Sequence, residues 1–330
     1  MADLTTNYMG LVLKNPVIIG SSGLTSSVIQ IKALEANGAA AVVLKSIFEE
    51  EIILDAQHNI DSAENAPMLY TAQSEAFDYL DLHIKEDTVK KYLNLIREAK
   101  KEVLIPVIAS INCISDYEWT AFARRIEDTG ADALELNIFL NPSDNSNLDF
   151  EKTYYDIISG VLSKVGIPVS VKLSQYFTRT GQFIKGISKT GIKGLVLFNR
   201  FYLPDIDTDQ MTLKEAEILS TPAEFHHVLR WIGLMSGNTG CNLAASTGIH
   251  DGQAVIKQIL AGADAVQIVS AIYKYGPVQI SKILSELENW MDQKGFNYIN
   301  QFKGKLSSRQ VKNPASYERM QFMKYFGGIT

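Results

Sequence analysis

Short runs of β-branched and other apolar residues alternate with amphipathic stretches along almost the whole chain. Runs of this length, bounded by turn residues, are typical of strands buried on both faces. Their alternation with helical stretches indicates parallel strands joined by helical crossovers. The predicted strands are 16–22 (PVIIGSS), 40–46 (AAVVLKS), 106–112 (PVIASIN), 133–139 (ALELNIF), 168–174 (PVSVKLS), 194–200 (GLVLFNR), 241–247 (CNLAAST) and 265–271 (AVQIVSA).

Amphipathic helices are predicted between these strands. Apolar residues recur at helical spacing in 27–38, 87–101, 118–130, 251–263 and 276–295, and several of these stretches end in the glycine expected after a helix. The phrases EANGAAAVV, EDTGADALEL and LAGADAVQI repeat one device, in which a glycine closes the helix and a tight turn starts the next strand. Eight strand–helix units predict a closed (β/α)8 barrel, the TIM-barrel class of α/β fold.

Two segments interrupt this rhythm. Residues 47–86 follow the second strand and residues 201–222 follow the sixth. Both come after the C-terminal end of a strand, where barrel enzymes place their sites, so they are predicted to cover a pocket. The alternative is that they are loop insertions without a role. The barrel is expected to span residues 1–307, followed by a C-terminal tail, 308–330, for which the sequence predicts no role.

Composition and charge exclude several classes of protein. The formal net charge of −6 and the pI near 5.5 leave no basic face for nucleic acid or an anionic membrane. No apolar run is long enough to span a bilayer. The two cysteines, Cys113 and Cys241, are too few for a disulfide framework, so a cytoplasmic location and small-molecule or protein partners are expected.

Polar side chains gather at the predicted strand ends, which meet at one mouth of a barrel. Buried amides and ammonium groups need partners, and a polar ligand would supply them. The alternative is an internal hydrogen-bond network. The set comprises Ser21, Ser22, Gly23, Lys45, Ser46, Asn112, Asn137, Lys172, Ser174, Asn199, Ser246, Thr247, Gly248, Gln267 and Ser270.

The last quarter of the chain contains two motifs that are typical of a phosphate-binding site. Residues 246–258 (STGIHDGQAVIKQ) place a glycine and small polar residues before a helix, and residues 266–277 (VQIVSAIYKYGP) supply the eighth strand and its turn. Backbone N–H groups and the helix dipole at this corner are suited to a phosphomonoester.

These motifs resemble the dihydroorotate dehydrogenase family of FMN-containing (β/α)8 barrels. The resemblance extends over about residues 5–307. It rests on residues 10–23 (GLVLKNPVIIGSSG), 42–47 (VVLKSI), 133–137 (ALELN), 168–174 (PVSVKLS), 196–199 (VLFN), 246–277 and 286–306.

The resemblance implies an FMN-dependent oxidoreductase that moves a hydride from a CH–CH bond of a small cyclic or carboxylated substrate to flavin N5. It also implies a homodimer; the electron acceptor stays open. Lys45, Asn137, Lys172 and Asn199 would act on the substrate, with Lys172 stabilising the reduced flavin. The implied cofactor residues are Ser21, Ser22, Gly23, Lys45, Ser46, Asn112, Asn137, Lys172, Asn199, Thr247, Gly248, Ser270 and Ala271.

The chain departs from this family at the catalytic base. In the family a Cys or Ser, followed by Pro-Asn, stands three residues after Glu-Leu-Asn, whereas here the position is Leu140 and the next residues are Asn-Pro. Leucine accepts no proton, which puts dihydroorotate itself in question as the substrate. The replacement candidates are Ser143, Asp144 and Cys113, with a plain loop serine as the alternative reading of Ser143. His250, near the phosphate corner, is a weaker candidate.

Two other functions are compatible with the residues. Lys172 is a possible Schiff-base nucleophile in a phosphate-binding aldolase barrel. Leu140 is also compatible with a flavin-binding subunit that has no activity of its own. The spacing of His, Cys, Asp and Glu predicts no metal site.

Overall fold

The computed structural model describes residues 2–48, 75–112, 116–140, 149–200 and 203–318. Eight parallel strands form a barrel that closes through pairing of β4 with β6, so the predicted fold is confirmed. The barrel strands are β3 (Val17–Ile19), β4 (Ala41–Val43), β6 (Val107–Asn112), β7 (Ala133–Asn137), β8 (Val169–Leu173), β9 (Gly194–Leu197), β12 (Asn242–Ser246) and β13 (Ala265–Ile268). Each lies inside its predicted range and is shorter at one or both ends.

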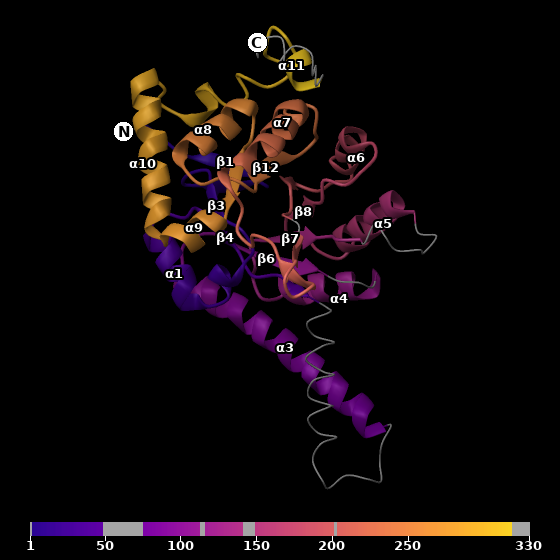
Figure 1. Ribbon diagram of the computed structural model, residues 1–330. Helices are drawn as coiled ribbons and strands as arrows, with labels where there is room; N and C mark the ends of the chain where they lie inside the picture. The colour runs from indigo at the N-terminus through magenta and orange to yellow at the C-terminus, as the bar shows by residue number, and fades with distance from the viewer. Residues whose placement is uncertain (1, 49–74, 113–115, 141–148, 201–202, 319–330) are drawn as a thin grey trace.

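Helices surround the barrel (Figure 1). They are α1 (Val28–Ala36), α3 (Glu75–Glu102), α4 (Asp116–Glu127), α5 (Phe150–Leu162), α6 (Thr180–Ile187), α7 (Phe225–Met235), α8 (Gly252–Ala261), α9 (Ser270–Tyr275), α10 (Val278–Lys294) and α11 (Ala315–Glu318). Short polar residues begin several of them: Ser27, Asp149 and Asp251 each accept a hydrogen bond from a first-turn backbone N–H. Helix α3 begins earlier than the predicted stretch 87–101, and α9 was not predicted.

An N-terminal hairpin packs against the end of the barrel at which the strands begin: Thr6 Oγ1 donates to the Asp264 carbonyl, and the Met9 N–H donates to Asn242 Oδ1. Strands β1 (Thr6–Tyr8) and β2 (Leu11–Leu13) pair with each other, and Tyr8 and Leu13 pack into an apolar cluster with inward-facing strand residues. Gly194 makes room for the hairpin, because a Cβ at that position would lie 2.8 Å from the Tyr8 hydroxyl oxygen. Apolar side chains therefore fill the barrel interior beside the hairpin, and the cavity described below lies at the C-terminal ends of the strands.

The segments after the second and sixth strands have different structures. After β4, a short strand β5 (Ile47–Phe48) extends along β6, and the rest of the insertion up to α3 lies outside the described residues. After β9, strands β10 (Pro204–Asp207) and β11 (Thr212–Glu215) form an exposed antiparallel hairpin. The chain then returns to the barrel through the 3-10 turn η2 (Pro222–Glu224).

The described part of the tail lies against α7 (Figure 1). The Arg230 side chain donates to the Tyr317 carbonyl at 2.8 Å, and the Tyr317 hydroxyl donates to the Leu306 carbonyl at 2.6 Å. Two further 3-10 turns are η1 (Gly23–Thr25) and η3 (Ile299–Gln301). Within the described ranges, no helix combines the length and apolar composition needed to cross a bilayer.

Candidate functional site

A cavity of about 210 Å³ lies at the C-terminal ends of the barrel strands. It extends from Ser21 and Lys172 to the turns after β12 and β13. The sequence-predicted residues that line it are Ser21, Lys172, Asn199, Ser246, Thr247, Gly248, Gln267 and Ser270. The fold therefore brings together residues that are up to 249 positions apart in the chain.

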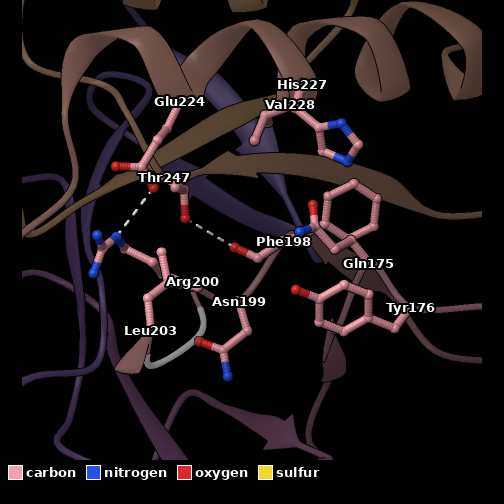
Figure 2. A pocket seen from close by; sticks show the side chains of 10 residues that line it. All are labelled: Gln175, Tyr176, Phe198, Asn199, Arg200, Leu203, Glu224, His227, Val228 and Thr247. Atoms are coloured by element: carbon pink, nitrogen blue, oxygen red, sulfur yellow. Dashed lines mark hydrogen bonds and ion pairs between the residues drawn. The ribbon is translucent and has the colours of Figure 1, made fainter. Parts of the chain in front are cut away.

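A second cavity, of about 470 Å³, adjoins the first (Figure 2). The two cavities share Asn199, Arg200 and Thr247 as lining residues. Gln175 and Tyr176, which follow β8, form one side of the second cavity, and His227 on α7 lies on another. Together the two spaces reach the size range of about 300–1,000 Å³ that is typical of cofactor and ligand sites.

The backbone at the predicted phosphate corner has an unusual conformation. Thr247 has φ = 84° and Gly248 has φ = 75°, so two consecutive residues lie in the left-handed region. A non-glycine residue in that region is uncommon and is often associated with function. The Thr247 hydroxyl donates to the Phe198 carbonyl at 3.2 Å, as Figure 2 shows, which helps to hold this turn.

Ser220 occupies the centre of this corner. Its hydroxyl accepts from the Gly248 N–H at 3.3 Å and lies 3.2 Å from His250 Nε2, while its own N–H donates to Ser270 Oγ at 2.9 Å. The hydroxyl thus uses the Gly248 N–H, one of the donors predicted to hold a phosphate. The corner offers backbone N–H and hydroxyl groups that are suited to a phosphomonoester. At the N-terminus of α8, however, the Gly252 and Ala254 N–H groups already donate to the carboxylates of Glu286 and Asp251.

Arg200 fixes the segment that carries Ser220. Its guanidinium donates to the carbonyls of Glu217 and Ile218 at 2.8 and 2.7 Å and pairs with Glu224 at 3.1 Å (Figure 2). Arg200 and Ser220 were not among the predicted site residues. Their roles depend on how the second insertion folds back over the mouth, and no local motif signals that path.

A series of hydrogen-bonded polar side chains leads from the cavity into the barrel interior. Lys172 Nζ donates to Gln267 Oε1 at 3.2 Å, and Gln267 Nε2 donates to Glu135 Oε2 at 2.6 Å. Lys172 is 7% exposed and Glu135 is 1% exposed. Burial raises the pKa of the Glu135 carboxyl, and the positive charge on Lys172 opposes that rise.

Two smaller networks order the other strand ends. Asn199 Nδ2 donates to Asn137 Oδ1 at 2.9 Å, which joins β7 to the segment after β9. On the opposite side, Ser46 Oγ lies 3.0 Å from Ser21 Oγ and 2.7 Å from Ser110 Oγ. These contacts support the hypothesis that Ser46 belongs to an internal hydrogen-bond network, since its hydroxyl already has two protein partners.

The remaining predicted residues lie around the mouth without lining the first cavity. Lys45 follows β4 and is exposed, and Asn112 ends β6 and is buried. The Ser22 hydroxyl donates to the Gly20 carbonyl at 3.2 Å, and Gly23 begins η1. Ala271 is fully buried in α9. Contact of these residues with a flavin stays a prediction.

Leu140 follows β7 and lines a different cavity from the one that Lys172 lines. It is half-buried and lines an aromatic cavity of about 210 Å³ with Phe139, Tyr154 and Phe177. It does not line the cavity that contains Lys172. The replacement candidates Ser143, Asp144 and Cys113 lie outside the described residues.

His250 lies beside the phosphate corner, with its Nε2 atom 3.2 Å from Ser220 Oγ. It is 5% exposed, and burial, followed by the positive charge of Lys274, lowers its pKa below the ordinary value of 6.5. A histidine with a lowered folded-state pKa stabilises the fold fully above its unfolded pKa, and this stability is lost as the pH falls towards and through the folded value. We therefore expect the wild-type unfolding temperature to fall from pH 7.5 to 5 more steeply than that of His250→Gln.

The control for this comparison is His226→Gln, which changes an exposed histidine on α7. Its pH profile should follow that of the wild type. Parallel profiles for His250→Gln and the wild type would show that His250 does not contribute to the slope. In the part of the chain that the structure describes, no three His, Cys, Asp or Glu side chains are grouped as a metal site would require.

The comparisons with known proteins agree with this architecture. A family model described as dihydroorotate dehydrogenase matches residues 3–291. The catalytic subunit of dihydroorotate dehydrogenase B (NAD(+)) from Thermoplasma volcanium is 29% identical, over 92% of this chain and 98% of that protein. The chloroplastic dihydropyrimidine dehydrogenase (NADP(+)) of Arabidopsis thaliana is 24% identical over 92% of this chain and 76% of its own length.

Dihydroorotate dehydrogenase A (fumarate) from Lactococcus lactis subsp. lactis is 23% identical over 92% of this chain and 99% of that protein. These relatives are named as dehydrogenases, and the match spans all eight barrel strands. The comparisons therefore favour an oxidoreductase over an aldolase that uses Lys172.

Proposed function

Because the chain belongs to the dihydroorotate dehydrogenase family, we propose that it is an FMN-dependent oxidoreductase acting on a CH–CH bond of a small cyclic or carboxylated substrate. The observation that carries the proposal is the buried Lys172 ammonium, which lines the same cavity as the Gly248 and Ser270 corner. A cation at one end of a cavity and neutral hydrogen-bonding groups at the other match the two ends of FMN, whose isoalloxazine takes up negative charge and whose tail ends in a phosphate.

The donor set supports FMN as the bound group. The Gly248 N–H and the Ser270 hydroxyl are suited to phosphate oxygens, and both already bind polar atoms of Ser220. Phosphate binding at this corner would replace contacts made by Ser220. The adjoining cavities offer space for the remainder of the cofactor. The proposed cofactor residues are Ser21, Ser22, Gly23, Lys45, Ser46, Asn112, Asn137, Lys172, Asn199, Thr247, Gly248, Ser270 and Ala271.

FMN, when bound, supplies the hydride acceptor of the reaction. Lys172 would place positive charge beside the part of the flavin on which negative charge develops, an effect that preorganised charges supply at low cost inside a protein. Asn137 and Asn199 hold each other in one orientation, so their free polar atoms are positioned for a substrate. Lys45 follows β4 at the same end of the barrel and is proposed to lie beside flavin and substrate.

The proton acceptor is the part of the proposed reaction at which this chain departs from the family pattern. Position 140 provides none, so the proton from the substrate must pass to another group. We propose Ser143 as the first candidate by its place in the sequence, followed by Asp144 and Cys113.

The proposal is tested by the absorbance spectrum of the purified protein. We expect a yellow protein that holds about one FMN per chain, identified by mass spectrometry after acid release, and that bleaches with dithionite. Free flavin added to a colourless preparation, followed by gel filtration, distinguishes loss of the cofactor during purification from an inability to bind it. A protein that stays colourless after this treatment would contradict the flavin function.

We also propose a homodimer, with the electron acceptor unassigned. Large apolar side chains are exposed on and beside the β10–β11 hairpin, as expected of a surface that a second subunit covers. They are Leu203, Ile206, Met211, Leu213 and Ile218. Light scattering should give twice the 36.6 kDa chain mass, and a monomer at micromolar concentration would exclude the dimer.

A further inference from the structure

Three buried side-chain oxygens, Glu135 Oε1, Ser170 Oγ and the Tyr8 hydroxyl oxygen, lie in one layer of the barrel. The Tyr8 and Ser170 hydroxyls interact with each other, whereas Glu135 Oε1 has no hydrogen-bond partner among the described residues. Glu135 is in register with Ser170, and Ser170 with Gly194. A Cβ on Gly194 would lie 2.8 Å from the Tyr8 hydroxyl oxygen, so the tyrosine reaches the same layer. Buried polar groups are normally satisfied, so the unpartnered Glu135 oxygen calls for an explanation.

Glu135 is the member of this layer that is connected to the cavity. Its other oxygen accepts from Gln267 Nε2 at 2.6 Å, and the amide oxygen of the same glutamine accepts from Lys172 at 3.2 Å. Gln267 is the one hydrogen-bond acceptor of Lys172 among the described residues. The glutamine amide thus presents its oxygen to the ammonium and its nitrogen to the carboxylate, which orients both groups.

This arrangement compensates two buried charges. An isolated ammonium or carboxylate is strongly disfavoured inside a protein, whereas a pair with good geometry is tolerated. Burial raises the pKa of the Glu135 carboxyl, while the Lys172 ammonium and the hydrogen bond from Gln267 favour its ionised form. The carboxylate lies below Lys172, on the side away from the cavity, because Glu135 precedes Asn137, the register partner of Lys172, by two residues.

We propose that Glu135 is a positioning residue that, through Gln267, fixes the Lys172 ammonium at the barrel mouth. Its negative charge also reduces the positive potential that Lys172 exerts on a bound flavin. The part that concerns flavin rests on the proposed function; the coupling between Glu135 and Lys172 does not. Glu135 contacts neither cavity, so it acts only through the residues between it and the ligand.

The first test uses the flavin-free protein and the variants Glu135→Gln, Lys172→Met and the double variant. Each single change leaves one buried charge unpaired, whereas the double change removes both. We expect each single variant to unfold at a temperature about 5 °C or more below the wild type. The double variant should unfold above either single variant.

The cycle remains informative if a single variant fails to fold, since a folded double variant then shows the coupling directly. Losses that add in the double variant would overturn the proposal. Ser170→Ala is the matched control in the same layer, because it removes a hydroxyl that interacts with Tyr8 without changing a charge. It should show no coupling with Lys172→Met.

The second test measures the midpoint potential of the flavin-loaded protein at neutral pH. Glu135→Gln keeps an oxygen acceptor for Gln267 Nε2 but removes the negative charge, so Lys172 should stabilise reduced flavin more strongly. We expect the ratio of reduced to oxidised FMN affinity to rise about tenfold, which is about 30 mV for a two-electron couple. Glu98→Gln, an exposed carboxylate on α3, controls for net charge.

A potential that is unchanged or lower in Glu135→Gln would overturn the part of the proposal that concerns flavin. If the wild-type protein binds no flavin, the proposed function fails, and the unfolding cycle still decides whether Glu135 positions Lys172. The two failures are therefore distinguishable.

Discussion

Lys172→Met is expected to bind oxidised FMN at least about tenfold more weakly than the wild type and to hold it in a form that is harder to reduce. Methionine keeps the length of the side chain but removes the ammonium that lines the cavity. The negative charge taken up on reduction then has no compensating cation, and the buried Glu135 carboxylate is left unpaired. Losing one such preorganised group typically costs about 100-fold or more, which for a two-electron couple is about 60 mV.

The measurement is a midpoint potential by dye equilibration, together with a fluorescence titration of flavin-free protein with FMN. Lys193→Met is the matched control, because Lys193 is exposed next to the start of β9, at the opposite end of the barrel. It should leave both values unchanged. An unaltered potential in Lys172→Met would place the flavin elsewhere and return the aldolase interpretation of this lysine to consideration.

The barrel could be predicted from the sequence because its signal is repeated eight times. Each strand is a short apolar run before a polar residue, and each glycine after a helix marks the same turn. The β1–β2 hairpin was missed because its first strand, TNY, contains no apolar run and is buried only at alternate positions. The hairpin after β9 was expected only as a cover, since exposed strands such as β11 carry no buried face to recognise.

The site was partly predictable for a related reason. Lys172, Asn199 and Gly248 follow from strand ends, because closure of the barrel forces those ends together. Ser220 was not predictable, since its place at the phosphate corner depends on contacts of Arg200, which lies twenty positions earlier in the sequence. The role of Glu135 is visible only when the register shows which inward-facing residues share a layer.

Dihydroorotate is expected to leave the flavin of the wild-type protein oxidised under anaerobic conditions, while dithionite reduces it. A positioned general base contributes about 10²–10⁴-fold to proton abstraction, and position 140 carries none. Reduction by dihydroorotate should therefore be at least about 100-fold slower than in an enzyme with a base at this position. Stopped-flow absorbance at the flavin band gives the rate.

The variant Leu140→Ser should not restore this reaction. Position 140 lines the aromatic cavity with Phe139, Tyr154 and Phe177, whereas Lys172 lines a different one, so a hydroxyl there would face apolar rings. Leu140→Ala separates the loss of packing from the gain of a hydroxyl, and both variants should behave alike towards dihydroorotate. Rapid bleaching of the wild-type flavin would instead establish dihydroorotate as a substrate and direct the search for its base to Ser143, Asp144 and Cys113. Bleaching only in Leu140→Ser would show that the leucine alone blocks an otherwise intact site.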